Sequence, residues 1–270
     1  MTALPITEQE NPRSQDLSSQ STADIVALMN DEDAAVAAAV KRVLGEVVKA
    51  VDETAARLAR GGRLFYTGTG TSGRLGVLDA SECPPTFGVP AELVQAVIAG
   101  GYDACHRAVE ASEDDADAGA ADLKQRGFAV GDVLVGIAAS GRTPYTVGAI
   151  KYARSLGAFT VALTVVPGSP ITEAAELSIV PVVGPEVVTG SSRLKAGTAQ
   201  KMVLNMISTA TMVRLGYVSG NRMSHLQAKN IKLRDRAVRI VMAETSVGHE
   251  EAVAKLEAAN WNVPEALKRK

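Results

Sequence analysis

The sequence predicts an α/β protein in which a five-stranded parallel sheet is doubly wound by helices on both faces. Five short apolar runs alternate with helix-like stretches through the middle of the chain. The runs are almost continuously apolar, which is typical of parallel strands buried on both sides. Hydrophobic residues make up 46% of the chain and aromatic residues only 4%, so Ala, Val, Leu and Ile must dominate the core. The strands are predicted at residues 64–66, 93–98, 133–138, 159–164 and 179–183.

Helices are predicted where apolar residues recur at intervals of three and four. Residues 1–20 are polar and are expected to form an extended arm. Helical spacing then covers residues 22–30 and a longer stretch, 36–58, which ends at a glycine pair. Pro84 and Pro85 are expected to stop the helix that follows the first strand. The helices between strands are predicted at residues 74–83, 102–125, 144–155 and 170–176, and two long helices at 194–215 and 222–243.

The chain divides into three expected regions: N-terminal arm and helices (1–60), a sheet domain (61–217), and a connecting helix with a helical tail (218–270). The tail from Ser246 onward has helical spacing, a turn and the start of another helix. We expect it to be too small to hold a core alone, and we expect its last helix to be incomplete. We therefore expect the tail to lean on a partner or on the main body.

Composition excludes several classes of protein. The formal net charge is -2 and the chain has two cysteines and three scattered histidines, so we expect a reducing, cytoplasmic location and no metal site. No apolar run is long enough for a membrane span, and no signal peptide is expected. Residues 191–270 are rich in Lys and Arg, which fits either a nucleic-acid surface or a solvated helix face. The spacing of Arg234, Arg236 and Arg239 favours the helix face, and no nucleic-acid partner is expected.

The loop after the first strand contains Gly68-x-Gly70-x-x-Gly73, placed between a strand and a helix. That placement matches a dinucleotide-binding fingerprint, but the second strand ends in Ile98-Ala99-Gly100-Gly101 and lacks the confirming acid. The loop is rich in hydroxyls instead. Hydroxyls and backbone N–H groups at a helix N-terminus suit a phosphate monoester, so a phosphosugar is favoured over a dinucleotide. The candidate ligand-binding residues here are Thr71, Ser72 and Gly73.

Two further loops of the same kind precede helices. One follows the third strand and offers Ser140, Gly141 and Thr143. The other offers Ser191 and Ser192 and opens a helix whose Lys195 is a further candidate for binding the anionic ligand. Ligands of open parallel sheets bind beyond the carboxyl ends of the strands. Three Ser- and Gly-rich loops at one such edge therefore indicate a polyhydroxyl, anionic ligand.

Carboxylates are the remaining candidates for chemistry, because the sequence shows no P-loop lysine and no Cys–His signature. Glu82 lies in Asp79-Ala-Ser-Glu-Cys-Pro-Pro85, where apolar neighbours would raise its pKa as a general acid requires. It is equally well a surface residue at a helix end. A second candidate acid lies in the run 110–115, although such runs are usually solvated. Cys83, Cys105 and the histidines are more often structural than catalytic.

Residues 68–88 closely resemble the signature of the N-acetylmuramic acid 6-phosphate etherases, a family of the sugar isomerase (SIS) superfamily. Residues 136–145, 186–201 and 30–33 resemble the family too. The resemblance implies an SIS-like fold and cleavage of the D-lactyl ether of N-acetylmuramate 6-phosphate by water. The products are N-acetylglucosamine 6-phosphate and D-lactate, in the recycling of peptidoglycan sugars.

The resemblance also implies roles for two glutamates. Glu82 matches the family's proton donor, and Glu113 matches its second catalytic glutamate. In the open-chain sugar the C1 aldehyde acidifies the C2 proton, so a carboxylate base can remove that proton. An acid protonates the lactyl oxygen as it leaves C3. Water then adds at C3. Glu113 is the expected base and Glu82 the expected acid. The resemblance implies no cofactor, and it implies a homodimer. The tail resembles a small ubiquitin-associated-like helical module, but this resemblance does not imply that the tail binds ubiquitin.

Two positions depart from the family pattern. Val166 stands where the family has Asn, and His225 where it has Asp. Neither change touches the two glutamates. The competing interpretations are a phosphosugar isomerase, which would also use a Glu base, and a non-catalytic phosphosugar sensor.

Overall fold

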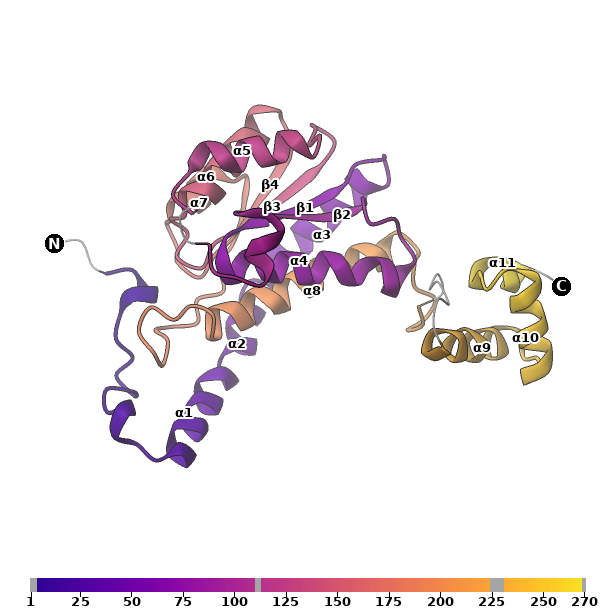
Figure 1. Cartoon of the computed structure of the whole chain (residues 1–270), viewed down its shortest axis with the longest axis horizontal. Coiled ribbons are helices and arrows are strands. Elements are labelled where there is room, and N and C mark those ends of the chain that lie inside the picture. Colours follow the sequence, from indigo (N-terminus) through magenta and orange to yellow (C-terminus); the bar gives the residue numbers. More distant parts are fainter. Residues whose placement is uncertain (1–3, 110–112, 224–230, 269–270) are drawn as a thin grey trace.

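The computed structural model describes residues 4–109, 113–223 and 231–268, and its centre is a five-stranded sheet (Figure 1). Every strand is parallel to its neighbours, and the order across the sheet is β2-β1-β3-β4-β5. The predicted sheet is therefore confirmed. The strands are β1 (Leu64–Gly68), β2 (Val94–Ile98), β3 (Val133–Ile137), β4 (Phe159–Leu163) and β5 (Leu177–Ile179).

The strand order reverses direction between β1 and β3. Leu64 of β1 pairs in register with Val94 on one side and with Val133 on the other. The chain leaves β1 toward β2, whereas it leaves β3 toward β4 and β5. The helices that follow β1 and β3 therefore diverge, which opens a crevice at the carboxyl ends of these two strands.

Helices cover both faces of the sheet. One apolar cluster joins the sheet to α2, α3, α4 and α8, and a second joins its opposite face to α5, α6 and α7. Mostly aliphatic side chains fill both clusters, because the central strands are buried on either side. The helices of this part are α1 (Thr22–Ala34), α2 (Val36–Lys41), α3 (Leu44–Leu58), α4 (Gly70–Phe87), α5 (Ala116–Gln125), α6 (Pro144–Ser155), α7 (Pro170–Ala174) and α8 (Lys195–Arg214).

The fifth strand is three residues long and ends earlier than predicted, at Ile179 rather than at Val183. Its partner β4 ends at Leu163, which pairs with Ile179, so the following residues have no strand to pair with. Pro181 also lacks the N–H that a ladder needs. Val183 is nevertheless buried. The apolar run therefore reflects packing on the core and not continued pairing.

Three of the predicted helical stretches differ from the structure in ways that have a clear cause in the packing or the backbone. α4 continues through Pro84 and Pro85 to Phe87 and ends at Gly88, whose φ is +69°. The proline φ angle is compatible with a helix, and buried Cys83 and Phe87 anchor the last turn. The stretch 36–58 breaks at Arg42-Val43 into α2 and α3. The stretch 102–125 becomes a short 3-10 turn, Gly101–Cys105, and α5, with residues 110–112 outside the described part.

The C-terminal helices are α9 (Ile231–Thr245), α10 (His249–Ala258) and α11 (Val263–Lys268). Part of the predicted helix 222–243 falls at 224–230, outside the described residues. The three helices pack around an apolar cluster of their own that includes Val241, Leu256 and Val263. As expected, the stretch from Ser246 does not enclose a core alone, because α9, the connecting helix, supplies the third wall of this cluster.

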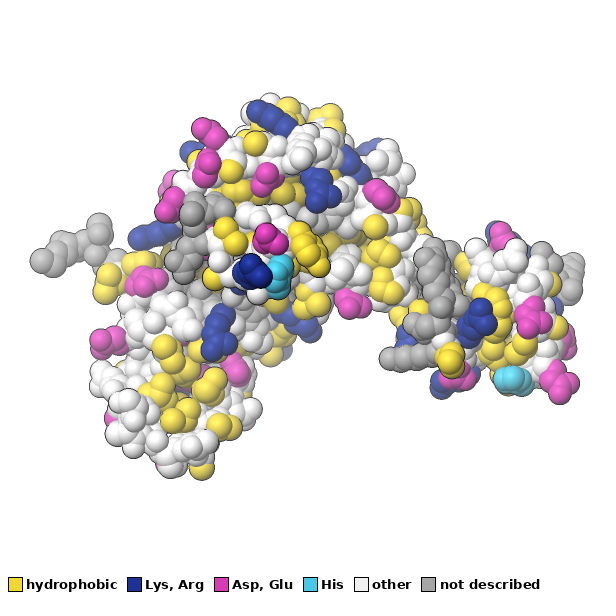
Figure 2. All heavy atoms as spheres, viewed as in Figure 1, with side chains coloured by type: hydrophobic (Ala, Val, Ile, Leu, Met, Phe, Trp, Pro, Cys, Tyr) yellow, Lys and Arg dark blue, Asp and Glu magenta, His cyan; other side chains and the backbone are white. Residues whose placement is uncertain are grey.

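The N-terminal helix α1 projects from the sheet domain (Figure 1). It contains no buried residue, and Val26 on it is 60% exposed. Figure 2 shows hydrophobic side chains on the surface of this projecting segment. Within the described residues, no helix is long and apolar enough to cross a membrane.

Candidate active site

The N-terminus of α4 is built by glycines that allow a close approach of backbones. A Cβ at Gly73 would lie 2.6 Å from the carbonyl oxygen of Gly68, and a Cβ at Gly68 would lie 2.7 Å from that of Ile137. Gly70 has a φ of +49°. These positions explain the spacing of the glycine motif. Among the described residues no side chain caps α4, so its first-turn N–H groups are left to bind an anion.

Glu113 lies at the point where the strand order reverses. Its carboxylate oxygen Oε1 is 3.4 Å from the position that a Cβ at Gly70 would occupy. Its backbone carbonyl accepts a hydrogen bond of 3.1 Å from the N–H of Tyr145, in the first turn of α6. The residue is therefore held between the N-termini of α4 and α6. A carboxylate in this crevice can serve as a base toward a ligand whose anionic group lies on the helix N-termini.

The second predicted loop lies at the N-terminus of α6. Gly141 has a φ of +68°, and a Cβ there would lie 2.1 Å from Oγ of Ser169. Ser140 and Thr143 are half-buried, and the Ser140 hydroxyl accepts a hydrogen bond from the N–H of Arg142. The loop is thus fixed by close packing against the loop after β4, with its hydroxyls at the sheet edge.

The two departures from the family pattern fall in different parts of the chain. Val166 is buried beside the second loop, and its N–H donates to Oγ1 of Thr164, which in turn donates to the carbonyl of Ala139. His225 lies outside the described residues.

The third predicted loop is adjacent to the first. A Cβ at Gly197, in the first turn of α8, would lie 3.6 Å from Cγ2 of Thr71. Ser72 is buried and its hydroxyl donates to Oε1 of Gln200, also on α8. Ser191 and Ser192 are half-buried just before this helix. The structure therefore brings the first and third loops together.

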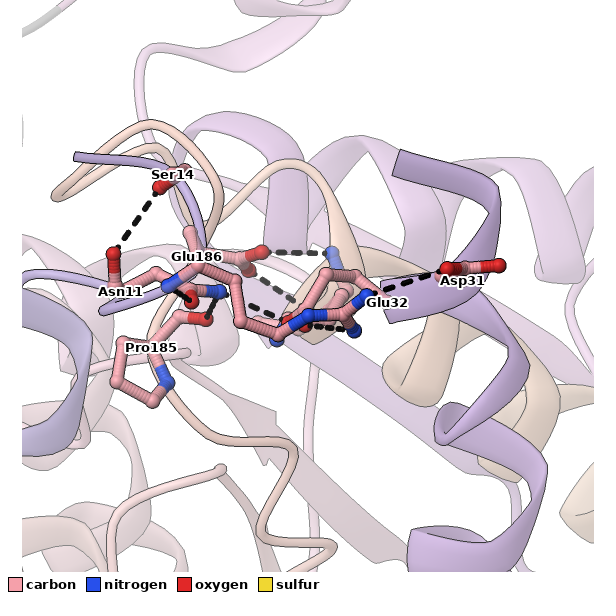
Figure 3. A network of polar contacts seen from close by, with 9 residues as sticks. Asn11, Ser14, Asp31, Glu32, Pro185 and Glu186 are labelled. Carbon is pink, nitrogen blue, oxygen red and sulfur yellow. Dashed lines mark hydrogen bonds and ion pairs between the residues drawn. The ribbon is translucent and has the colours of Figure 1, made fainter. Parts of the chain in front are cut away.

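The N-terminus of α8 is already capped by a protein carboxylate. Glu186 accepts hydrogen bonds of 3.0 and 2.9 Å from the N–H groups of Lys195 and Ala196. Burial raises the pKa of Glu186, although these two N–H groups and the Lys195 charge oppose the shift. The anion-binding capacity of α8 is thus used within the protein, in contrast to that of α4. Lys195 is buried, and its ammonium pairs with Glu32 of α1. Figure 3 shows the surroundings of Glu32.

Glu82 is not brought near Glu113 within one chain. It lies on α4 twelve positions beyond Gly70, which corresponds to about 18 Å along a helix axis. The residue is exposed, so the desolvation expected from its apolar neighbours is absent in the single chain. Two groups that act on adjacent carbons of one sugar must lie much closer together.

A buried carboxylate that the sequence analysis passed over holds α4 in place. Asp79 accepts hydrogen bonds from the Tyr66 hydroxyl (2.8 Å), the Asn205 amide (2.7 Å) and the Ser208 hydroxyl (3.1 Å). Burial, followed by the Asp79 charge, raises the pKa of Tyr66 well above its usual value. The network ties α4 to β1 and α8. An acid at a buried position of an apolar helix face is the signal that could have found it.

Cys83 is buried next to this network. Burial, the charge of Asp79 and that of Glu82 raise the pKa of its thiol to about 12. The thiol is therefore protonated at neutral pH and is no nucleophile. Among the described residues no cluster of three or more His, Cys, Asp or Glu could hold a metal ion.

The five-stranded parallel sheet with helices on both faces has an SIS-like α/β fold. The SIS domain model matches residues 120–210, and the glucokinase regulatory protein N-terminal SIS domain model matches residues 46–154. A putative phosphosugar isomerase from Bacteroides fragilis has a TM-score of 0.57 at 20% identity, covering 74% of this chain and 95% of its own. A phosphoheptose isomerase from Francisella tularensis gives 0.58 at 16% identity, covering 72% and 100%.

Sequence relatives narrow the class to one family. An N-acetylmuramic acid 6-phosphate etherase from Cronobacter sakazakii is 56% identical over 262 residues, which are 97% of this chain and 88% of that protein. Another from Jannaschia sp. is 53% identical over 97% of this chain and 83% of its own length. The chain belongs to the N-acetylmuramic acid 6-phosphate etherase family.

Proposed function

We propose that this protein cleaves the D-lactyl ether of N-acetylmuramate 6-phosphate with water, as a carbon–oxygen lyase. The products would be N-acetylglucosamine 6-phosphate and D-lactate. The observation that carries the proposal is the position of Glu113 in the crevice between the N-termini of α4 and α6, in a chain that is 56% identical to a protein named for this activity. The role of the enzyme would be the recycling of peptidoglycan amino sugars.

The phosphosugar would be held by the loops at the sheet edge. Free N–H groups and the partial positive charge at the α4 N-terminus favour a phosphate there. The remaining hydroxyls and glycines would orient the sugar, so that the reacting atoms meet Glu113 in one geometry. The proposed binding residues are Thr71, Ser72, Gly73, Ser140, Gly141, Thr143, Ser191 and Ser192.

The proposed chemistry is elimination followed by addition. Glu113 removes the C2 proton of the open-chain sugar, because the adjacent aldehyde stabilises the resulting carbanion. The C3–oxygen bond breaks, and Glu82 gives its proton to the lactyl oxygen. Water then adds to C3 of the unsaturated aldehyde and a proton returns to C2. Each such proton transfer typically contributes about 100- to 10,000-fold in rate.

The active enzyme would be a homodimer in which Glu82 of one copy completes the site of the other. The separation of about 18 Å along α4 supports this arrangement, since no bending of a regular helix could close it. Surface chemistry supports it as well. An apolar groove between α3 and α8 is lined by Val48, Met206 and Val213, and α1 projects with its apolar side chains uncovered. A second copy would cover these surfaces.

Incubation with N-acetylmuramate 6-phosphate tests the activity. We expect release of D-lactate, and deuterium from heavy water at C2 of the product. Glu82→Gln and Glu113→Gln should each abolish lactate release while still binding N-acetylglucosamine 6-phosphate. Formation of a ketose without lactate would establish an isomerase instead, and binding without turnover would establish a sensor.

Mixing the two inactive variants tests the shared site. A dimer that contains one Glu82→Gln and one Glu113→Gln chain has one intact site if the glutamates act across the interface, and none if they act within a chain. Random reassociation should therefore restore about a quarter of the wild-type activity. A mixture that stays inactive after proven exchange of chains would refute the shared site.

The remaining expectations also belong to the proposal. The working location would be the cytoplasm, which suits a chain whose Cys83 and Cys105 are both free thiols. The three regions 1–60, 61–217 and 218–270 would act as arm, phosphosugar domain and helical tail. The reaction needs neither a cofactor nor a nucleic-acid or membrane partner.

A further inference from the structure

The N-terminal arm, defined here as residues 4–20, is attached to the loop that precedes α8. The N–H of Gly190 donates to the carbonyl of Thr7 (3.1 Å), and the Asn11 amide donates to the carbonyl of Pro185 (3.2 Å). Thr7 and Asn11 are only 3% and 4% exposed. Polar residues of an otherwise exposed arm are buried here because the loop supplies their hydrogen-bond partners.

The charge of Lys195 is satisfied inside this contact. Its side chain is 4% exposed, and that of its partner Glu32 is 12% exposed. The carboxylate of Glu32 also accepts hydrogen bonds from Asn11 (2.8 Å) and Arg13 (2.9 Å). Figure 3 shows Glu32 and Asn11 in this network, beside Pro185 and Glu186. Burial raises the pKa of Glu32, but the hydrogen bonds from Lys195 and Asn11 outweigh it and lower the pKa overall. A buried ammonium needs such a partner, because desolvation of an unpaired charge is costly.

The attached loop carries residues of the proposed site. Residues 185–194 lead from Pro185, through Ser191 and Ser192, into α8, and Glu186 at their start caps that helix. The first turn of α8 then lies against Thr71 at the start of α4. A shift of this loop would therefore move the serines relative to the α4 N-terminus, where the phosphate is proposed to bind.

The contact also joins two stretches that lie far apart in the sequence. Glu32 lies in the stretch 30–33 and Lys195 in the stretch 186–201. In the structure these stretches meet through one ion pair between residues 163 positions apart.

We propose that Lys195 and Glu32 are positioning residues: their ion pair clamps the N-terminal arm and α1 to the loop 185–194, and thereby fixes Ser191 and Ser192 for the phosphosugar, without Lys195 touching the substrate. The inference rests on the proposed function for its kinetic consequence. Its structural consequence, a loop held in place by the arm, is independent of any activity.

Kinetics of Glu32→Gln and Lys195→Met test the clamp. If Lys195 acts through Glu32, both variants should raise KM for N-acetylmuramate 6-phosphate by about tenfold, with kcat within about threefold of wild type. The double variant should be little worse than either single one, because both remove the same contact. If Lys195 binds substrate directly, Lys195→Met alone raises KM and Glu32→Gln does not; that result would overturn the proposal.

Limited trypsin digestion gives a readout that needs no substrate. Arg193 is exposed within the loop, so release of the loop should speed cleavage after Arg193 in Glu32→Gln, mapped by mass spectrometry. Asp31→Asn is the matched control: the neighbouring carboxylate pairs with Arg13 at the surface, where both side chains are more than half exposed. It should leave both KM and digestion unchanged.

The milder variant Asn11→Ala keeps the ion pair and removes only the amide contacts, and it should show an intermediate rate of cleavage. It replaces Glu32→Gln if that chain fails to fold. If Asn11→Ala and Glu32→Gln are digested no faster than wild type, the clamp is refuted. If the variants are digested faster than wild type but the wild-type chain releases no lactate, only the etherase activity is refuted.

Discussion

Glu113 and Gly70 lie against each other at the reversal point of the sheet. The carboxylate oxygen Oε1 of Glu113 is 3.4 Å from the position of a Cβ on Gly70, and Gly70 has a left-handed φ of +49°. The glycine therefore permits the left-handed turn into α4, and a methyl group at this position would lie in van der Waals contact with the carboxylate. This contact places a candidate base beside the α4 N-terminus.

Gly70→Ala should impair activity more than stability. The added methyl group contacts the Glu113 carboxylate. The alanine must also keep the left-handed φ of Gly70, which destabilises the folded state by about 1–2 kcal/mol. Gly220→Ala is the matched control, because its φ of +58° imposes similar backbone strain but nothing lies within 4 Å of the new methyl group. We expect similar loss of unfolding free energy in both variants and a drop in kcat/KM in Gly70→Ala alone. Equal activity of the two would contradict the assignment of this crevice.

Gly141→Ala should destabilise the chain more than Gly168→Ala does. Both glycines have similar left-handed φ values, +68° and +65°. The Cβ at Gly141 would lie 2.1 Å from Oγ of Ser169, whereas that at Gly168 has open space. The difference between the two variants in urea unfolding therefore reports the steric clash alone. We expect the free energy of unfolding to fall by about 1–3 kcal/mol more in Gly141→Ala than in Gly168→Ala. No difference between the variants would mean that the two loops are not packed as described.

Asp79→Ala should be strongly destabilising. It leaves the Tyr66 hydroxyl, the Asn205 amide and the Ser208 hydroxyl without their acceptor. Each buried donor left unsatisfied costs about 1–3 kcal/mol, so a loss of about 3 kcal/mol or more is expected in urea unfolding. Asp117→Ala, an exposed change on α5, serves as the control and should fall within about 0.5 kcal/mol of wild type.

Acid should weaken the wild-type chain more steeply than Glu32→Gln. Burial raises the pKa of Glu32, but the hydrogen bonds from Lys195 and Asn11 bring it below the usual 4.5, so the folded state favours the ionised form. That stabilisation is present above pH 4.5 and is lost as the pH falls through the lower folded-state pKa. Unfolding free energies measured across the acid range should converge for the two chains at low pH. A constant difference down to the lowest pH would contradict the ion pair.

Cys105 should react with iodoacetamide well before Cys83. The Cys83 thiol is buried and its pKa is raised to about 12, so almost no thiolate exists near neutral pH. Cys105 is half-buried. Peptide mapping after brief alkylation should find the label at Cys105, and urea should make the two sites react alike. Preferential labelling of Cys83 in the folded chain would contradict its burial.

Local patterns were sufficient for the sheet and for the loops at its edge. A strand buried on both sides must be apolar at every position, so runs such as 133–138 could be recognised directly. Parallel strands end at one edge, so the loops near Thr71 and Ser140 had to lie at one crevice. The ends of the helices were harder to predict from the sequence. α4 continues past Pro84 and Pro85 because the buried side chains of Cys83 and Phe87 hold its last turn in place.

Contacts between distant segments could not be deduced from spacing. Lys195 looked like a ligand for an anion, yet its charge is paired with Glu32, 163 positions away. Glu82 and Glu113 looked like partners, yet α4 holds them apart in one chain. Side-chain periodicity reports only whether a position is buried, and it carries no information about which buried or charged group it meets. The chemical character of the crevice followed from residue types, whereas the pairing of its charges depends on how the packed helices bring remote residues together.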